Sequence, residues 1–259
     1  MKSFFCIFFL LANVLFAQQV HFIVVADNQA NNIEDVVHAN QILINEFIQD
    51  LIEVTNLKIN SLKLTESNFN AKTIWSCLKE KQINANDIIL FYYTGHGYRN
   101  EFQETVWPSL YLTNEKAGLD FTDILQILQE KRPALLLALA DCCNNIIPSK
   151  FAPPIIKAQL HHHKIISDNF KKNVTYLFSL KGTVVISAAK AGSFAYGTSK
   201  GGFFTKSFLD SFNLIPHISW EESIKSMQKL LIQYVDPKSD SKRKQEIQSY
   251  LHLSHDGSF

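Results

Sequence analysis

Long apolar runs that stop abruptly at polar residues are the clearest feature of the hydropathy pattern. One run begins after Asp87 and ends at His96, and a second begins at Ala134 and ends at Cys143. Neither run alternates between apolar and polar positions, which is typical of a strand buried on both faces of a parallel sheet. The sequence therefore predicts two such strands, one with a histidine and the other with a cysteine at its carboxyl end.

The residues before the histidine strand follow the rhythm of a β-α-β-α-β unit. In two segments apolar residues recur every three or four positions, as on one face of a helix, and the intervening segments have strand-like patterns. This order predicts an α/β fold with a parallel sheet and right-handed crossovers. The predicted elements are strands at 20–27 and 57–64 and helices at 33–54 and 71–82.

The pattern after Gly97 is more varied. An irregular segment containing Trp107 and Pro108 is expected to form a loop over the strand ends. Prolines, three consecutive histidines and scattered lysines predict a mobile surface segment, and a candidate processing region, at 146–178. The further predicted elements are helices at 120–131, 203–212 and 220–234 and a strand at 182–189, while residues 239–259 give no clear pattern.

Length and charge narrow the choice of architecture and partner. The 259 residues contain no Gly/Ser/Pro-rich linker between two complete halves, so we expect one domain over residues 18–259. The net charge is +1 and only 19% of residues are charged. Because there is no excess of either sign to attract a polyanion, nucleic acid and anionic membranes are poor candidates as partners.

The first 17 residues have the anatomy of a secretory signal peptide. A basic start is followed by an apolar run and then by Ala17, and the run is too short to span a bilayer comfortably. We expect cleavage after Ala17, a secreted or periplasmic product, and no stable membrane anchor after removal. The alternative is that this run forms a buried first strand or helix.

Cysteine usage favours a free thiol. Removal of the first 17 residues leaves Cys77, Cys142 and Cys143, an odd number with two adjacent. Neighbouring cysteines rarely bridge each other without strain, so this is a poor disulfide framework. Cys77 lies in a helical pattern and is expected to pack as a small hydrophobe.

A thiol and an imidazole at the ends of two neighbouring strands suggest hydrolysis. In open α/β sheets, ligands bind beyond the carboxyl ends of the strands, where His96 and Cys143 would face one crevice. A thiolate attacks a carbonyl carbon, and a nearby imidazole takes the thiol proton and returns it to the leaving amine. The alternative for His96 is a satisfied core histidine.

Three blocks of residues resemble the caspase and metacaspase clan of cysteine peptidases. They are Phe91-Tyr92-Tyr93-Thr94-Gly95-His96-Gly97, Asp141-Cys142-Cys143-Asn144, and the run from Ser187 to Thr205. The resemblance covers about residues 19–235, and the spacing of the histidine and cysteine, about 50 residues, is also that of caspases. It implies a caspase-like three-layer α/β/α sandwich with a mostly parallel sheet of about six strands.

The resemblance also assigns roles. It implies that Cys143 is the nucleophile, that His96 is the general base and acid, and that the backbone N–H groups of Gly97 and Cys143 bind the oxyanion. A glycine suits position 97 because a Cβ would crowd the bound carbonyl. Cys142 would point the other way along the strand, although an exchange of roles between the two cysteines stays open.

Two acids bear on specificity. Caspases bind aspartate through arginine, whereas metacaspases bind arginine or lysine through acids, and Asp27 and Asp141 match the acidic arrangement. A guanidinium between two carboxylates relieves their repulsion through paired hydrogen bonds, so we expect cleavage after Arg or Lys. The alternatives are a loop or helix-capping acid for Asp27 and a structural hydrogen bond for Asp141. Asn144-Asn145 departs from both families and leaves the substrate class open.

The predicted function is therefore a cysteine endopeptidase acting on peptide or protein substrates, without a cofactor, and with self-cleavage at lysines of 146–178 as a hypothesis. Calcium dependence, known among metacaspases, follows from no ligand motif in the chain. The runner-up is a catalytically silent caspase-like interaction or regulatory module, and a third reading is a thiol hydrolase acting on other bonds. The tract at 161–163 is a weak metal candidate, and Asn173-Val174-Thr175 matches a glycosylation acceptor.

Overall fold

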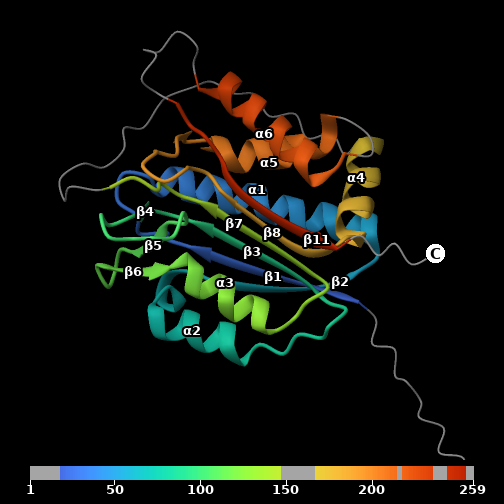
Figure 1. Cartoon of the computed structure of the whole chain (residues 1–259), viewed down its shortest axis with the longest axis horizontal. Helices are drawn as coiled ribbons and strands as arrows, with labels where there is room; N and C mark the ends of the chain where they lie inside the picture. Colours follow the sequence, from blue (N-terminus) through green and yellow to red (C-terminus); the bar gives the residue numbers. More distant parts are fainter. Residues whose placement is uncertain (1–17, 147–166, 215–217, 236–243, 255–259) are drawn as a thin grey trace, which may run out of the picture.

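The chain is described by a computed structural model that covers residues 18–146, 167–214, 218–235 and 244–254. Its centre is a six-stranded sheet in the order β11-β8-β7-β3-β1-β2 (Figure 1). Five strands run parallel, and β11 pairs antiparallel with β8 at one edge. The strands are β1 (Gln19–Ala26), β2 (Lys58–Leu64), β3 (Ile88–Thr94), β7 (Leu135–Asp141), β8 (Lys181–Ser187) and β11 (Gln248–Ser254).

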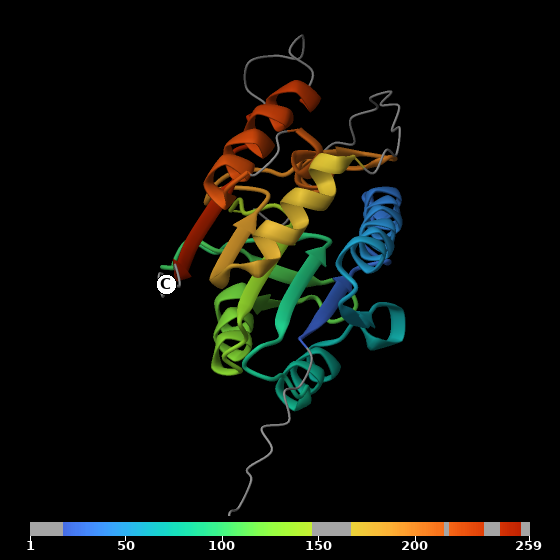
Figure 2. The ribbon, with the colours of Figure 1, turned by 90° about the vertical axis from the view of Figure 1, so that its right-hand side faces the viewer.

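Helices cover both faces of this sheet, as Figure 2 shows when the molecule is turned by a quarter. One face carries α1 (Glu34–Thr55), α4 (Asp168–Ser179), α5 (Phe203–Leu214) and α6 (Trp220–Tyr234), and the other carries α2 (Ala71–Glu80) and α3 (Phe121–Glu130). A single 3-10 turn, η1 (Glu66–Asn68), precedes α2. The prediction of a three-layer α/β fold with about six mostly parallel strands is confirmed.

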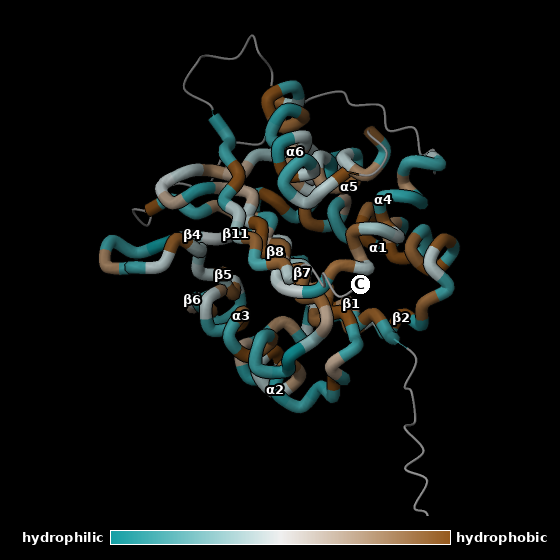
Figure 3. The backbone as a smooth tube through the Cα atoms, turned by 45° about the vertical axis from the view of Figure 1, so that its right-hand side comes forward, coloured by the Kyte–Doolittle hydropathy of each residue, from teal (hydrophilic) through white to brown (hydrophobic). Residues whose placement is uncertain are grey.

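Successive residues of each central strand enter opposite layers of the core. Phe22 packs edge-on against Phe47 of α1, with ring centroids 6.5 Å apart, whereas its neighbour Ile23 lies in the cluster under α2 and α3. Phe91 likewise meets Phe121 of α3, with centroids 5.9 Å apart. Both faces of these strands are therefore buried, which explains their unbroken apolar runs. Figure 3 shows the same hydrophobic stretches gathered in the strands and their covering helices.

Polar side chains mark the starts of four helices. Asn70, Asp120 and Ser167 each accept a hydrogen bond from a backbone N–H in the first turn of α2, α3 and α4. Ser219 and Glu222 form a reciprocal capping box at the start of α6. Each such cap stabilises the folded chain by about 1 kcal/mol, so these residues fix where the helices begin.

The segment after His96 is more regular than the sequence predicted. A three-stranded antiparallel sheet, β4 (Gly97–Tyr98), β5 (Ser109–Leu112) and β6 (Ala117–Asp120), stands where a loop was expected. A second small hairpin joins β9 (Gly197–Thr198) to β10 (Gly201–Gly202). Strands of two to four residues are too short to show an alternating pattern, which is why these elements were missed.

The prediction of an irregular segment at 146–178 is wrong for its last part, because residues 168–178 belong to α4. Phe170, Val174 and Leu177 form a buried stripe at helical spacing that packs on α1 and α5. Asn173 is fully buried, and its side chain bonds the carbonyl of Phe212 and the N–H of Ile218. It therefore cannot accept a glycan in the folded chain. Residues 147–166, including the three histidines, lie outside the described residues.

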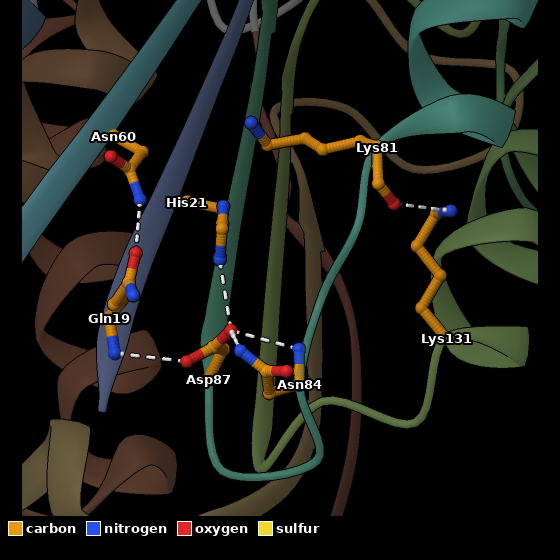
Figure 4. A network of polar contacts seen from close by, with 7 residues as sticks. All are labelled: Gln19, His21, Asn60, Lys81, Asn84, Asp87 and Lys131. Carbon is orange, nitrogen blue, oxygen red and sulfur yellow. Dashed lines mark hydrogen bonds and ion pairs between the residues drawn. The ribbon is translucent and has the colours of Figure 1, made fainter. Parts of the chain in front are cut away.

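The amino-terminal end of the sheet is held by a buried carboxylate, Asp87 (Figure 4). Its two oxygens accept hydrogen bonds from Gln19 N–H, from the His21 ring and from the backbone and side chain of Asn84, at 2.8–3.0 Å. Burial alone would raise the pKa of Asp87, but these bonds outweigh it and hold the pKa below its usual value. The network ties the start of β1 to the turn before β3.

The sheet includes a strand from near each end of the chain, β1 and β11. The expected signal segment 1–17 lies outside the described residues, and β1 begins two residues after it. Part of the ambiguous tail forms the edge strand β11. Among the helices that the structure describes, none combines the length and apolar character required to cross a membrane.

Candidate active site

The register of the central strands brings the histidine and the cysteine together. Thr94 at the end of β3 pairs with Asp141 at the end of β7, so His96 and Cys143 each lie two residues beyond a paired position. Both line a single pocket at the carboxyl end of the sheet. Its other walls come from α1, from residues 195–197 and from Gly202, and the lining residues include Val36, Val37, Asn40, Asp141, Ala195 and Tyr196.

Gly97 packs directly against the backbone and side chain of the cysteine loop. A Cβ at this position would overlap the carbonyl oxygen of Cys143 and the Sγ of Cys142. The glycine is therefore required by the packing of the two loops, in addition to any demand of a bound carbonyl. Any larger residue would push the histidine loop away from the cysteine loop.

The imidazole of His96 is oriented by a backbone carbonyl. Its Nε2 lies 3.0 Å from the oxygen of Asn31, in the segment between β1 and α1. A carbonyl can only accept, so Nε2 carries a hydrogen, and in the neutral ring the lone pair is then on Nδ1. The backbone of His96 is held in turn by Tyr93 Oη at 2.7 Å and by Tyr111 N–H at 2.9 Å, which both donate to its carbonyl oxygen. Both the ring and the backbone of His96 are therefore held in place by hydrogen bonds.

The thiol of Cys143 is buried against a second loop. Only 8% of the residue is exposed, and its Sγ accepts the N–H of Ala195 at 3.4 Å and lies 3.7 Å from the carbonyl oxygen of the same residue. Burial raises the pKa of the thiol to about 11, although the Ala195 N–H acts against this and the charge of Asp141 adds to it. At neutral pH the thiol is protonated in this state.

Cys142 occupies a different environment from its neighbour. It is 2% exposed and belongs to the core under α2 and α3, with its Sγ against Gly97. Burial raises its pKa well above the usual value. Cys77, Cys142 and Cys143 are all free, so the described part of the chain has the free thiols that the sequence led us to expect.

The two acids are placed differently. Asp141 lines the pocket, and its Oδ2 accepts Asn40 Nδ2 at 3.0 Å and Thr205 Oγ1 at 2.6 Å. Burial raises the pKa of Asp141 to about 6, and the hydrogen bonds from Thr205 and Asn40 limit the rise. Asp27 is fully buried, accepts bonds from Gln29 N–H and Thr113 Oγ1, and is not among the residues that line the pocket. Asp141 thus lines the pocket directly, whereas Asp27 lies behind it, with its Cβ against Gly95, the residue before His96.

The family described as "Caspase domain" matches residues 16–256, which is nearly the whole chain. The chain belongs to the caspase-domain family. Two solved structures share its fold. Caspase-1 from Spodoptera frugiperda is 11% identical, with a TM-score of 0.54 and coverage of 90% of this chain and 87% of that one. Protein GSU0716 from Geobacter sulfurreducens is 12% identical, with a TM-score of 0.52 and coverage of 90% and 92%. None of the curated proteins matches the sequence.

Asn144, the residue after Cys143 in this caspase domain, has a structural role. The residue is fully buried, and its Nδ2 donates to the carbonyls of Val106 at 2.8 Å and Ala189 at 3.3 Å. Its backbone exchanges two further bonds, with Ser193 and Gly192. Asn144 thereby ties the Cys143 loop to the segments around Val106 and Ala189–Ser193.

Sequence reasoning missed several residues of this caspase domain's site. Asn40 carried a readable signal, because it is a polar residue within the buried stripe of α1 between Val37 and Leu43. Asn31 and Ala195 act through backbone atoms, so their residue types gave no signal. Within the described ranges, no three His, Cys, Asp or Glu side chains converge where they could hold a metal ion.

Proposed function

We propose that this caspase-domain protein is a cysteine endopeptidase that hydrolyses peptide bonds through Cys143 and His96. The observation that carries the proposal is the shared pocket, which is lined both by a free thiol and by an imidazole whose Nε2 is fixed on the Asn31 carbonyl. Nδ1 of His96 then takes the thiol proton as Sγ attacks the scissile carbonyl carbon. The same nitrogen returns the proton to the leaving amine, and water completes the cycle by hydrolysing the thioester.

The tetrahedral oxyanion requires donors on the cysteine side of the pocket. The backbone N–H groups of Gly97 and Cys143 supply them in this proposal, because Gly97 packs directly on the Cys143 peptide. Donors that are already fixed by packing stabilise the developing charge without reorganisation. The glycine therefore has both a packing role and a catalytic one.

Substrate binding must also activate the thiol. The pKa of the Cys143 thiol is about 11 while Ala195 covers its Sγ, an arrangement called the closed state below. In this state almost none of the thiol is ionised at neutral pH. A substrate that enters beside Ala195 displaces the loop from Sγ and exposes the thiol to His96. Activation then depends on occupation of the pocket rather than on a permanently ionised pair.

Asp141 supports a preference for a basic residue before the scissile bond. It is the only carboxylate that lines the pocket among the described residues, and Asn40 and Thr205 already orient it. A lysine or arginine side chain that reaches it would form a charge-assisted hydrogen bond in a desolvated site. Asp27 is the second carboxylate in this proposal, because each of its oxygens accepts one hydrogen bond and keeps a further lone pair for a cation.

Matched fluorogenic peptides that end in arginine, lysine or aspartate test this proposal. We expect cleavage of the arginine and lysine peptides by the wild type and by Cys142→Ala, and none by Cys143→Ala. Ester substrates in the same panel separate peptide hydrolysis from a thiol hydrolase of another kind. Equal turnover by wild type and Cys143→Ala would overturn the assignment of the nucleophile.

One observation favours the catalytically silent alternative. The Cys143 thiol is almost fully buried and has a raised pKa, which is the character of an inert cysteine. If peptides of all three kinds and thiol-reactive peptide probes leave Cys143 untouched under reducing conditions, the domain is a binding or regulatory module.

Self-processing and export follow as secondary proposals. Of the candidate lysines, Lys171 and Lys172 lie inside α4, where the peptide bonds are protected until the helix opens. We therefore place self-cleavage at Lys150, Lys157 or Lys164, and a Cys143→Ala protein that stays intact beside a processed wild type tests it. Export predicts a mature chain that begins at Gln18, which N-terminal sequencing of the secreted or periplasmic product checks.

A further inference from the structure

The geometry points to Gln245 as a positioning residue that holds the Ala195 wall of the pocket against Cys143. This inference rests on the proposed function for its catalytic consequence, but its effect on the thiol can be measured separately. Gln245 lies just before the edge strand β11, more than a hundred residues from the nucleophile along the chain. It is not part of the pocket lining itself.

Both ends of the Gln245 amide are used. The residue is 3% exposed, its Nε2 donates to the carbonyl of Ala188 at 3.0 Å, and its Oε1 accepts the N–H of Tyr196 at 3.1 Å. Ala188 follows β8, and Tyr196 lies on the pocket wall. The side chain therefore links the start of the loop, at Ala188, to its pocket-lining end, at Tyr196.

Gln245 is itself held from behind by α6. Gln228 donates through Nε2 to the Gln245 carbonyl at 3.0 Å and accepts the N–H of Ile247 through Oε1 at 2.9 Å. On the other side, Lys190 N–H donates to the Glu246 carbonyl at 2.8 Å. The short segment 245–247 is thus fixed between α6 and the loop that runs from residue 188 to residue 196.

The coupling to the thiol passes through one peptide unit. The N–H that Gln245 holds belongs to the peptide bond between Ala195 and Tyr196, and the oxygen of this same peptide lies 3.7 Å from Cys143 Sγ. The preceding N–H, that of Ala195, donates to Sγ. The two buried hydrogen bonds of the Gln245 side chain therefore fix the position of the Ala195–Tyr196 peptide relative to the Cys143 sulfur.

Loss of the two Gln245 hydrogen bonds should make the Cys143 thiol more reactive and, at the same time, lower the catalytic efficiency. With the Tyr196 peptide released, the loop moves off Sγ, so the thiol becomes more accessible and more easily ionised. Productive substrate alignment falls at the same time, because the wall that orients the substrate no longer has one position. A purely structural role would instead lower stability without this divergence.

Gln245→Ala tests the inference, with Gln248→Ala as the control. Gln248 lies three residues further on, at the start of β11, and pairs with Ser187 through its backbone. Two quantities are measured for each protein: the rate at which iodoacetamide alkylates Cys143, resolved by peptide mass spectrometry, and kcat/KM on an arginine peptide. For Gln245→Ala we expect alkylation about tenfold faster and kcat/KM about tenfold to a hundredfold lower. Gln248→Ala should match the wild type in both.

Gln245→Glu provides the second variant, in case the alanine protein does not fold. A neutral glutamic acid can donate to the Ala188 carbonyl as the amide does, whereas a carboxylate places negative charge against that oxygen. The alkylation rate of Gln245→Glu relative to the wild type should therefore fall toward one as the pH is lowered. The nearby Lys190–Glu246 ion pair is exposed and common to both proteins, so it cancels in this ratio.

The outcomes separate this inference from the proposed function. If the wild type has no peptidase activity, the alkylation rates still report on the Ala195 wall. Unchanged alkylation in both Gln245 variants would overturn the inference, and so would an alkylation ratio for Gln245→Glu that does not vary with pH. Slower alkylation in Gln245→Ala would also contradict it.

Discussion

Cys143 is capped by Ala195, whose N–H and carbonyl oxygen lie 3.4 Å and 3.7 Å from the sulfur. One loop residue thus covers the proposed nucleophile through its backbone alone. The state described by the structure is consequently a closed one, with a protonated thiol. In the proposed mechanism, opening of this loop is part of the catalytic cycle.

The closed state predicts slow alkylation of Cys143 at neutral pH. A pKa near 11, against about 8.5 for a free cysteine, corresponds to a thiolate fraction smaller by roughly a hundredfold or more. We expect iodoacetamide to label Cys143 in the folded wild type slower by about this factor than in the urea-denatured chain. Labelling of Cys77, which is partly exposed, serves as the internal control. Similar rates for Cys143 in both states would contradict the closed arrangement.

Asp141 should impose an acid limb on the cleavage of basic peptides. Its pKa of about 6 means that the carboxylate becomes protonated, and loses its attraction for a cation, as the pH falls through this value. In Asp141→Asn the Oδ1 can still accept from Asn40 and Thr205, so we expect a folded protein. Its kcat/KM on an arginine peptide should fall roughly thirtyfold, which corresponds to about 2 kcal/mol of transition-state binding. The decline in activity near pH 6 should be absent. Retention of that limb in the variant would assign it to another group.

Gly97→Ala should uncouple the two loops. The added methyl group would meet the Cys143 carbonyl and the Cys142 sulfur, which costs about 1–3 kcal/mol of folding free energy as overpacking. We expect a folded protein with a lower melting temperature and no measurable peptidase activity, because His96 and the Gly97 N–H are displaced together. Wild-type activity in this variant would mean that the loops can separate without harm.

The Asp87 network predicts a pH-dependent contribution to stability at the opposite end of the sheet. The pKa of Asp87 is lowered in the folded state, so its stabilisation is fully present above the usual carboxylate pKa and is lost as the pH falls through the folded-state value. Asp87→Asn should cost about 2 kcal/mol in urea denaturation at pH 7, as expected for the loss of hydrogen bonds to a charged group, and the difference from wild type should shrink toward pH 3. The exposed Glu101→Gln should change stability by about 0.5 kcal/mol or less. A constant difference across this pH range would show that the charge of Asp87 is unimportant.

Much of the fold could be predicted because the buried strands carry strong patterns. The unbroken runs that end at His96 and Cys143 predicted two central strands, and the helix predicted at 220–234 is confirmed as α6. The stripe of α4 was equally regular but was obscured by the prolines and lysines before and within it. Short strands such as β4 and β9 form because they pair with neighbouring segments, so no local sequence pattern predicts them.

The site was predictable only as far as side chains define it. The residue types of His96, Cys143 and Asp141 were enough to single out three side chains that line one pocket. The contacts made by Asn31 and Ala195 use backbone atoms far away in the chain, and no residue preference marks them. Gln245 reads as one polar residue in an ambiguous tail, and its burial becomes evident only once α6 and β11 are in place.

The most direct measurement of the central claim is covalent labelling by a peptidyl acyloxymethyl ketone that ends in arginine, followed by peptide mass spectrometry. The account predicts one adduct, on Cys143, in the wild type and in Cys142→Ala, and little or none in His96→Ala at neutral pH. An adduct on Cys142, or equal labelling of Cys143 with and without His96, would contradict a mechanism in which these two strand ends act as one pair.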